Sequence, residues 1–221
     1  MKAQAKWMIV ISALVGATAL AAPIRGTVRL PEGTTPEPEG GLETYYWKVW
    51  NGFLDPRTPR RDPGRELAVV LTGSGVEAPI GCTYRIQGGD LYPRTLVAKG
   101  GAALSIENRD GCAHELQSED IPDFAPLATS PGNARAINVP AGGPYAISDR
   151  LYPHVQGTVH ALSDLVACAR VDSQGRFLFE GIPNGSYTLK IFDGADEVHT
   201  APVEVADNEP LTVDPIALGG N

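Results

Sequence analysis

The sequence predicts an all-β fold, on the evidence of its turn residues and the length of its apolar runs. The chain has 25 glycines and 19 prolines among 221 residues, about a fifth of the total. They separate short runs rich in Val, Ile, Thr and Tyr, and no stretch sustains the 3.6-residue apolar period of a helix. Short strands with frequent turns are typical of β-sandwiches and barrels.

Individual strands follow from the same pattern. PIRGTVRLPEG (23–33) alternates apolar and polar residues, and ELAVVLTGSG (66–75) predicts a buried strand that ends in glycine. The strands expected after Cys82 lie in CTYRIQ, TLVAKGG, AALSIENRDG, ARAINVPAGG, GTVHAL, ACARVD, HTAPVEVAD and LTVDPIAL. DSQGRFLFEGIPNGSYTLKIF (172–192) predicts a tight pair of strands with turns at 172–175 and 183–185.

Residues 1–22 predict a secretory signal peptide. Lys2 and Lys6 precede an apolar run that ends in small residues with an A-x-A pattern at Ala19 and Ala21. No later segment is long and apolar enough to cross a bilayer. We therefore expect a periplasmic or secreted protein without a transmembrane span.

The charge of the chain disfavours polyanionic partners. The formal net charge is −8, and loss of Lys2 and Lys6 with the signal would make it −10. Such a protein repels nucleic acid and anionic lipid. The three cysteines, Cys82, Cys112 and Cys168, allow at most one internal disulfide in an oxidising compartment, and the sequence does not say which pair forms.

DLYPRTLVAKGGAALSIENRDGCAHEL (90–116) resembles the front half of a cupredoxin, the Greek-key barrel that holds type 1 copper. The similar features are Tyr92-Pro93, two strands around a glycine turn, Asn-x-Asp at 108–110, and His114, which the resemblance implies as the first copper ligand. AVVLTGSGVEAPIGCTYRI (68–86) is similar to the lead-in of exported bacterial cupredoxin-like proteins of the methylamine-utilisation-like subgroup.

The second half of this copper site departs from the family. Copper-binding relatives carry a loop of the form Cys-x-x-His-Pro-x-Met-x-Gly, since a thiolate and two imidazoles hold copper with a weak axial thioether. Alignment on Pro153 and Gly157 puts Asp149 at the cysteine, Tyr152 at the histidine and Val155 at the methionine. The resemblance therefore implies a barrel that has lost copper, so we expect no cofactor.

ARVDSQGRFLFEGIPNGSYTLKIFD (169–193) resembles the carboxypeptidase regulatory-like, or transthyretin-like, β-sandwich. The predicted fold is thus an all-β chain with a cupredoxin-like Greek-key barrel at 76–162 and a transthyretin-like β-sandwich at 163–221. Residues 23–75 are expected to complete that sandwich, which makes the barrel an insertion. The alternative is a tandem order in which the N-terminal strands join the barrel.

A rebuilt metal site is the rival interpretation of the barrel. Cys112, His114 and His154 could converge at one end and bind copper or zinc. The simpler interpretation has Cys112 in a disulfide or as a buried free thiol, with both histidines as surface or capping residues. His160 lies on an expected strand, where packing or an exposed sheet face is favoured over ligation.

Two further features bear on function. An aromatic stretch and an arginine cluster follow the first strand and could form a binding platform: Tyr45, Tyr46, Trp47, Trp50, Arg57, Arg60 and Arg61. The alternative is a strand that packs its rings and arginines that pair within the fold. We found no catalytic motif, and no base and nucleophile are paired by spacing. We expect a non-catalytic envelope module that binds protein or polysaccharide.

Overall fold

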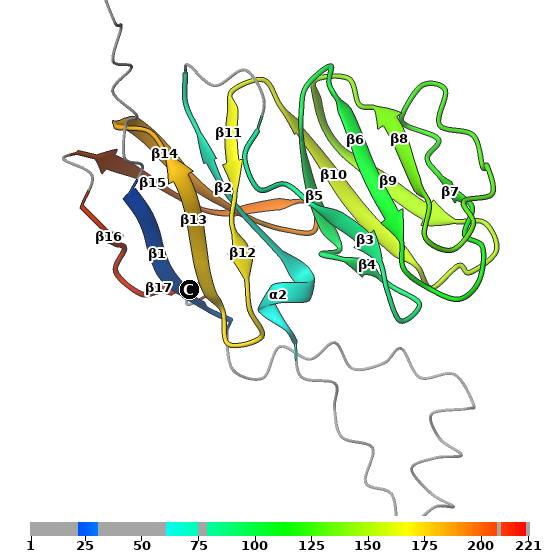
Figure 1. The fold of residues 1–221 in the computed structure, drawn as a ribbon, viewed down its shortest axis with the longest axis horizontal. Helices are drawn as coiled ribbons and strands as arrows, with labels where there is room; N and C mark the ends of the chain where they lie inside the picture. Colours follow the sequence, from blue (N-terminus) through cyan, green and yellow to red (C-terminus); the bar gives the residue numbers. More distant parts are fainter. Residues whose placement is uncertain (1–21, 31–60, 75–78, 207–208, 220–221) are drawn as a thin grey trace, which may run out of the picture.

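The computed structural model describes residues 22–30, 61–74, 79–206 and 209–219, and within them the chain forms two packed β-units (Figure 1). The predicted all-β class is confirmed, since the described helix is the single turn α2 (Pro63–Glu66). Asp62 caps this turn by accepting the backbone N–H of Gly64 at 3.0 Å.

The first unit, which we call the sandwich, combines strands from both ends of the chain. One sheet contains β12 (Arg170–Val171), β13 (Arg176–Ile182), β1 (Ala22–Arg29), β16 (Leu211–Thr212) and β17 (Ile216–Ala217), with β16 and β17 both on β1. The other contains β11 (Leu165–Cys168), β2 (Leu67–Thr72), β14 (Gly185–Asp193) and β15 (Asp196–Val205). Both β1 and β2 therefore pair with strands that follow residue 162.

The second unit, which we call the nested unit, lies between β2 and β11 in the chain. One of its sheets contains β5 (Thr95–Lys99), β10 (Gln156–Leu162), β9 (Gly142–Asp149) and β7 (Leu116–Gln117). The other contains β4 (Leu91–Tyr92), β3 (Tyr84–Ile86), β6 (Ala103–Asn108) and β8 (Ala134–Asn138). Their inner faces share one core that includes Leu96, Ile106 and Val159.

Strands β13 and β14 do not form the tight pair that the sequence predicts. They lie in different sheets, and β14 pairs with β2 and β15. The reason is that both strands are amphipathic toward the same core. Phe177 and Phe179 enter it from one sheet, and Leu189 and Ile191 enter it from the other. The turn at 183–185 therefore carries the chain over the core.

A third cluster of buried side chains joins the two units. Ala68 and Val70 of β2 and Phe192 of β14 pack there with Val97 and Leu165. His160 stacks on Phe192 with ring centroids 4.3 Å apart, and its Nε2 donates to the Gly194 carbonyl at 2.7 Å. Of the two interpretations favoured for His160, packing and an exposed sheet face, the structure shows packing.

Polar contacts reinforce this junction. Asp90 of the nested unit is buried and accepts hydrogen bonds from Arg65 Nε of α2 at 2.8 Å and from Arg94 Nη2 at 2.6 Å. Cys82 and Cys168 form a disulfide across a sequence separation of 86 residues. Tyr84 contacts the Cys168 sulfur at 3.6 Å, and burial raises the pKa of this phenol.

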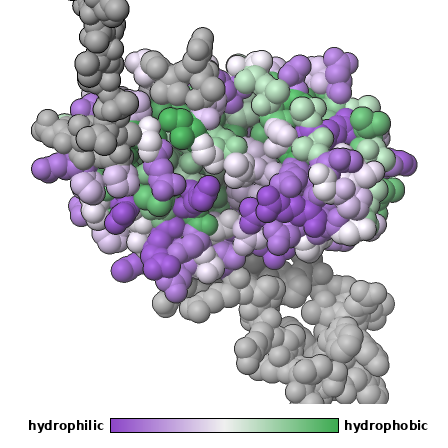
Figure 2. Space-filling model, in the orientation of Figure 1, coloured by the Kyte–Doolittle hydropathy of each residue, from purple (hydrophilic) through white to green (hydrophobic). Residues whose placement is uncertain are grey.

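The surface is mixed in character. On the face drawn in Figure 2, hydrophilic side chains gather around the middle of the molecule, and hydrophobic ones lie in separate small patches. Among the described residues, the exposed large hydrophobic side chains are Leu127, Leu151 and Val198. No helix in the described part is long and apolar enough to span a membrane.

The disulfide yields the first prediction. Replacing both Cys82 and Cys168 by serine should lower the free energy of unfolding by about 2–5 kcal/mol, because the bond closes a long loop in the unfolded chain. Urea denaturation of the oxidised proteins measures this change. Cys112→Ser is the matched control, with an expected change within about 0.5 kcal/mol. Equal midpoints for the double variant and the control would contradict the prediction.

Candidate functional site

The candidate site lies at one end of the nested unit, where the segment after β6 meets the end of β9. Asn108, the last residue of β6, donates from Nδ2 to the carbonyls of Cys112 and Thr129, both at 2.8 Å. Its Oδ1 accepts the backbone N–H of Asp110 at 2.9 Å. The Asn-x-Asp feature of the sequence therefore shapes the loop that carries Cys112 and leads into His114.

His114 is buried, and both of its ring nitrogens face carboxylates. Its Nδ1 lies 2.8 Å from Asp149 Oδ2, and the exposed fractions of the two side chains are 1% and 0%. Its Nε2 lies 3.2 Å from Asp110 Oδ2. An imidazole and a carboxylate removed from water are each costly unless they are hydrogen-bonded. The close contact with Asp149 supplies that partner.

Asp149 is further held by backbone amides. Its Oδ1 accepts N–H groups of Leu151 at 2.7 Å and Tyr152 at 3.0 Å, and its Oδ2 accepts that of Glu115 at 3.2 Å. A carboxylate with several charge-assisted hydrogen bonds orders the segments that donate them. Asp149 thus fastens the 150–155 loop and the His114 segment to the end of β9.

The residues aligned with copper ligands come together in space. Tyr152 packs on His114 with ring centroids 5.1 Å apart. Val155 is fully buried and donates its N–H to the Tyr152 carbonyl at 2.8 Å, and its own carbonyl accepts the Asp149 N–H at 3.0 Å. The arrangement offers an imidazole, a carboxylate, a phenol and an aliphatic side chain. It does not offer the thiolate, second imidazole and thioether of type 1 copper.

Cys112 is exposed and free, so the expectation of a disulfide or a buried thiol is wrong. The disulfide forms instead between Cys82 and Cys168 because these residues lie side by side at the junction, with Cα atoms 4.9 Å apart. The Cys112 sulfur lies 3.8 Å from His114 Nε2. The hydrogen bond and the charge of Cys112 raise the pKa of the nearby Tyr152 phenol.

The three candidate metal ligands converge only in part. Cys112 and His114 are neighbours, but the Tyr152 ring packs on His114 and also lies edge-on to His154, with centroids 6.2 Å apart. A further neighbour of His114 is Asp110, which the sequence predicted as part of the Asn-x-Asp turn and not as a ligand. Among the described residues, no group of three or more His, Cys, Asp and Glu side chains is arranged to hold a metal ion.

The structure also brings together three reactive groups that the spacing in the sequence did not pair. Cys112, His114 and Asp149 follow one another as thiol, imidazole and carboxylate, which is the order that activates nucleophiles in cysteine enzymes. In this protein Asp110 competes for the same Nε2 atom. No sequence motif could have revealed the three groups, because Asp149 is 35 residues from His114.

Most of the predicted binding platform, Tyr45, Tyr46, Trp47, Trp50, Arg57 and Arg60, lies outside the described residues. Arg61 is described, and it pairs within the fold. Its Nη2 donates to both carboxylate oxygens of Asp193, at 2.7 and 2.9 Å, and its Nε pairs with Glu66. Burial alone lowers the pKa of Arg61, but the bonds to Asp193 and Glu66 outweigh it and raise the pKa.

Comparisons with known proteins give weak structural neighbours. No protein-family model and no curated protein matches the chain. Solved structures of amicyanin are similar to part of it. A point mutant of amicyanin in its reduced state is 16% identical, with 42% of this chain and 98% of that chain covered and a TM-score of 0.33. Amicyanin from Paracoccus versutus is 17% identical, covering 42% and 96%, also at 0.33. Because scores this low carry no argument, the proposals below rest on the site itself.

The buried pair yields the second prediction. Asp149→Ala should lower the free energy of unfolding by about 3–5 kcal/mol, because it leaves a buried imidazole and three amides without their acceptor. Urea denaturation at neutral pH measures this loss. Arg150→Ala removes only the partner of Glu115 in a surface ion pair and should cost at most about 1 kcal/mol. Similar losses in both variants would contradict a special role for Asp149.

Asp110 yields a prediction about acid stability. Burial alone raises the pKa of Asp110, but the amides of Gly89 and Gly88 and the His114 ring outweigh it and lower the pKa to below the ordinary 3.8. The unfolded chain therefore takes up this proton at a higher pH than the folded chain does. The stabilisation is present above about pH 4 and is lost as pH falls through the lower folded pKa.

The Asp110→Asn variant should consequently show a flatter decline in the free energy of unfolding below about pH 4. Denaturation curves at a series of pH values measure it. Asp123→Asn, which removes a carboxylate from an exposed position with φ of 59°, is the control and should keep the wild-type slope. An unchanged slope in Asp110→Asn would show that the amide bonds do not perturb this carboxyl.

Proposed function

We propose that this protein is a non-catalytic, exported binding or structural module whose nested unit is a cupredoxin-like barrel without type 1 copper. The observation that carries the proposal is the hydrogen bond between His114 Nδ1 and Asp149 Oδ2 at 2.8 Å. Asp149 stands at the position that the family resemblance gives to the copper thiolate. A carboxylate there satisfies the imidazole that a metal would otherwise bind.

The packing around the pair supports the same conclusion. Tyr152 and Val155 stand at the two remaining ligand positions, and neither provides a nitrogen or sulfur donor. In the described part of the chain, every buried side-chain nitrogen and oxygen has a hydrogen-bond partner. A metal ion would have to displace existing bonds of His114, so the hydrogen bond to Asp149 and metal binding exclude each other at Nδ1.

Export of the protein, and contact with an envelope protein or polysaccharide, are parts of this proposal. The predicted signal peptide supports export, and the Cys82–Cys168 disulfide is in keeping with an oxidising compartment. The aromatic and arginine residues at 45–60 remain the candidate contact surface. Arg61 is instead assigned a structural role, because its guanidinium binds both Asp193 and Glu66.

A rival function is metal handling through Cys112, His114 and His154. The specific observation in its favour is the 3.8 Å distance between the Cys112 sulfur and His114 Nε2, a spacing that two ligands of one soft metal ion can adopt. Against it stand the contact of Asp110 with the same nitrogen and the packing of the Tyr152 ring on both histidines.

Metal analysis separates the two functions. Protein purified without chelators, then incubated with Cu(I) or Zn²⁺ and desalted, should retain no stoichiometric metal, because the neighbouring thiol and imidazole lack a third donor placed to complete a site. His114→Ala and Cys112→Ser should leave this result unchanged. One metal ion per chain that is lost in Cys112→Ser, whose exposed side chain can change without disturbing the core, would overturn the proposal in favour of the rival.

A further inference from the structure

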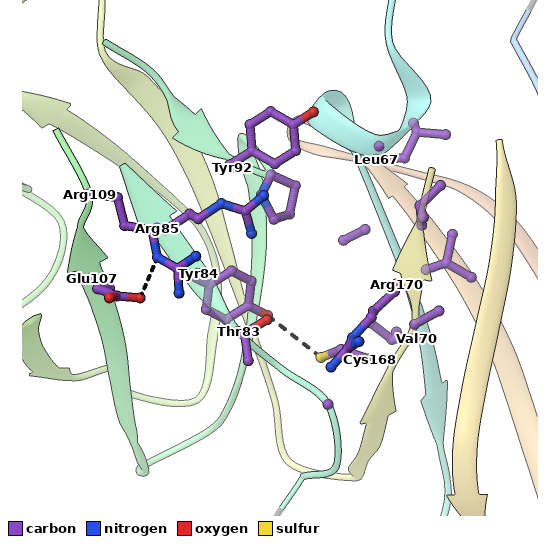
Figure 3. Close-up of a pocket in the computed structure, with 17 residues that line it drawn as sticks. Leu67, Val70, Thr83, Tyr84, Arg85, Tyr92, Glu107, Arg109, Cys168 and Arg170 are labelled. Carbon is purple, nitrogen blue, oxygen red and sulfur yellow. Dashed lines mark hydrogen bonds and ion pairs between the residues drawn. The ribbon is translucent and has the colours of Figure 1, made fainter. Parts of the chain in front are cut away.

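A cleft of about 510 Å³ lies between the two units, away from the His114 site. The sandwich contributes β2 and the residues around β11 and β12, and the nested unit contributes β3, β4 and the end of β6. Figure 3 shows side chains from both units around this space. The volume is in the range of small-molecule sites, which span roughly 300–1,000 Å³ and often lie between domains.

The charge of this cleft is opposite to that of the whole protein. Its charged lining consists of Arg85, Arg109 and Arg170 together with one acid, Glu107. Arg109 Nε binds Glu107 at 2.8 Å, so that acid is already neutralised. The chain as a whole has a formal net charge of −8. Surface charges that are merely solvated have no reason to gather, so three guanidinium groups around one cleft call for a separate explanation.

The arginines on opposite walls keep donors available for a ligand. Arg170 is exposed, and its side chain makes no hydrogen bond or ion pair with any residue that the structure describes. Arg85 uses Nε to bind Gln87 at 2.8 Å and lies over the Tyr92 ring, 4.7 Å from its centroid. This cation–π contact holds the guanidinium over the ring. In Figure 3, the Arg85 guanidinium lies beside Tyr92 and the Arg170 guanidinium lies beside Cys168, so the two come from different units.

The walls are also fixed relative to each other. Cys168 lines the cleft and is bonded to Cys82, which directly precedes the cleft residues Thr83, Tyr84 and Arg85. Tyr84 contacts the sulfur of Cys168 across the same joint, as Figure 3 shows. A site whose walls are already positioned loses less conformational entropy when a ligand binds.

We propose that this cleft binds an anionic ligand with at least two carboxylate, phosphate or sulfate groups, one held by Arg85 and Arg109 and another by Arg170. Guanidinium groups bind such oxyanions through paired, charge-assisted hydrogen bonds. Two anionic groups are required because the arginines belong to opposite walls. This inference gives a ligand class to the proposed binding role, on which it rests, and assigns it to residues separate from the aromatic stretch.

Isothermal titration with citrate tests the proposal, with trigalacturonate as the arm that distinguishes an acidic saccharide from a free small acid. We expect saturable binding at one site per chain that weakens as salt is added. Arg170→Ala should weaken citrate binding by about tenfold, in line with the loss of a hydrogen bond to a charged group. Arg29→Ala removes an exposed arginine that does not line the cleft and should leave the affinity within about twofold.

If trigalacturonate binds more tightly than citrate and Arg170→Ala weakens that binding, the ligand source is a saccharide. If citrate binds more tightly, the source is a free acid. Absence of saturable binding, or equal weakening in Arg170→Ala and Arg29→Ala, overturns the proposal. Failure here is independent of the metal analysis, since copper uptake depends on Cys112 and His114 and not on the cleft arginines.

Discussion

Strand β2 is the element on which the architecture depends, because both of its faces are buried. Leu67, Val69 and Leu71 point into the core of the sandwich, and the alternate residues Ala68 and Val70 point into the junction with the nested unit. A strand with side chains alternating between two faces can serve two cores only if every position is apolar or paired. All six residues of β2 are buried accordingly. The nested unit is therefore packed directly on the sandwich core.

The candidate site shows how one buried polar pair can hold two segments of a barrel end together. Asp149 and His114 join the end of β9 to the segment after β6, which is a connection that a shared metal ion would also make. The pair also positions Tyr152 and Val155 through backbone bonds to Asp149. Hydrogen bonds and apolar packing are enough to order these loops.

The sequence allowed the strands and the loop alignment to be predicted because local patterns govern both. The apolar run of β2 and the Asn-x-Asp turn at 108–110 depend on neighbouring residues, and both occupy the expected places. The pairing of β13 and β14 was missed because adjacency in sequence favours a hairpin, whereas burial of Phe177 and Leu189 in one core separates them into two sheets. The disulfide partners were not predictable because Cys82 and Cys168 meet only once both units are folded.

The same distinction applies to the sites. Alignment of the loop drew attention to Tyr152 and Val155. The contacts of His114 with Asp110 and Asp149 depend on loop geometry that spacing does not encode. The cleft arginines were invisible for a related reason. Arg85, Arg109 and Arg170 lie in three separate strands or turns, and only the packing of two units places them around one space. Residues that only the packing of two units brings together leave no local motif.

The position of β1 has a consequence for how the chain is made. This strand is synthesised before its partners β13, β16 and β17, all of which follow residue 175 in the chain. Its buried residues Ile24 and Val28 have no strand partner until then. Strand β2 and the nested unit can gather their local contacts earlier. Strand β1 can therefore pair only late, and nascent chains that stop before residue 176 expose its apolar edge to chaperones and proteases.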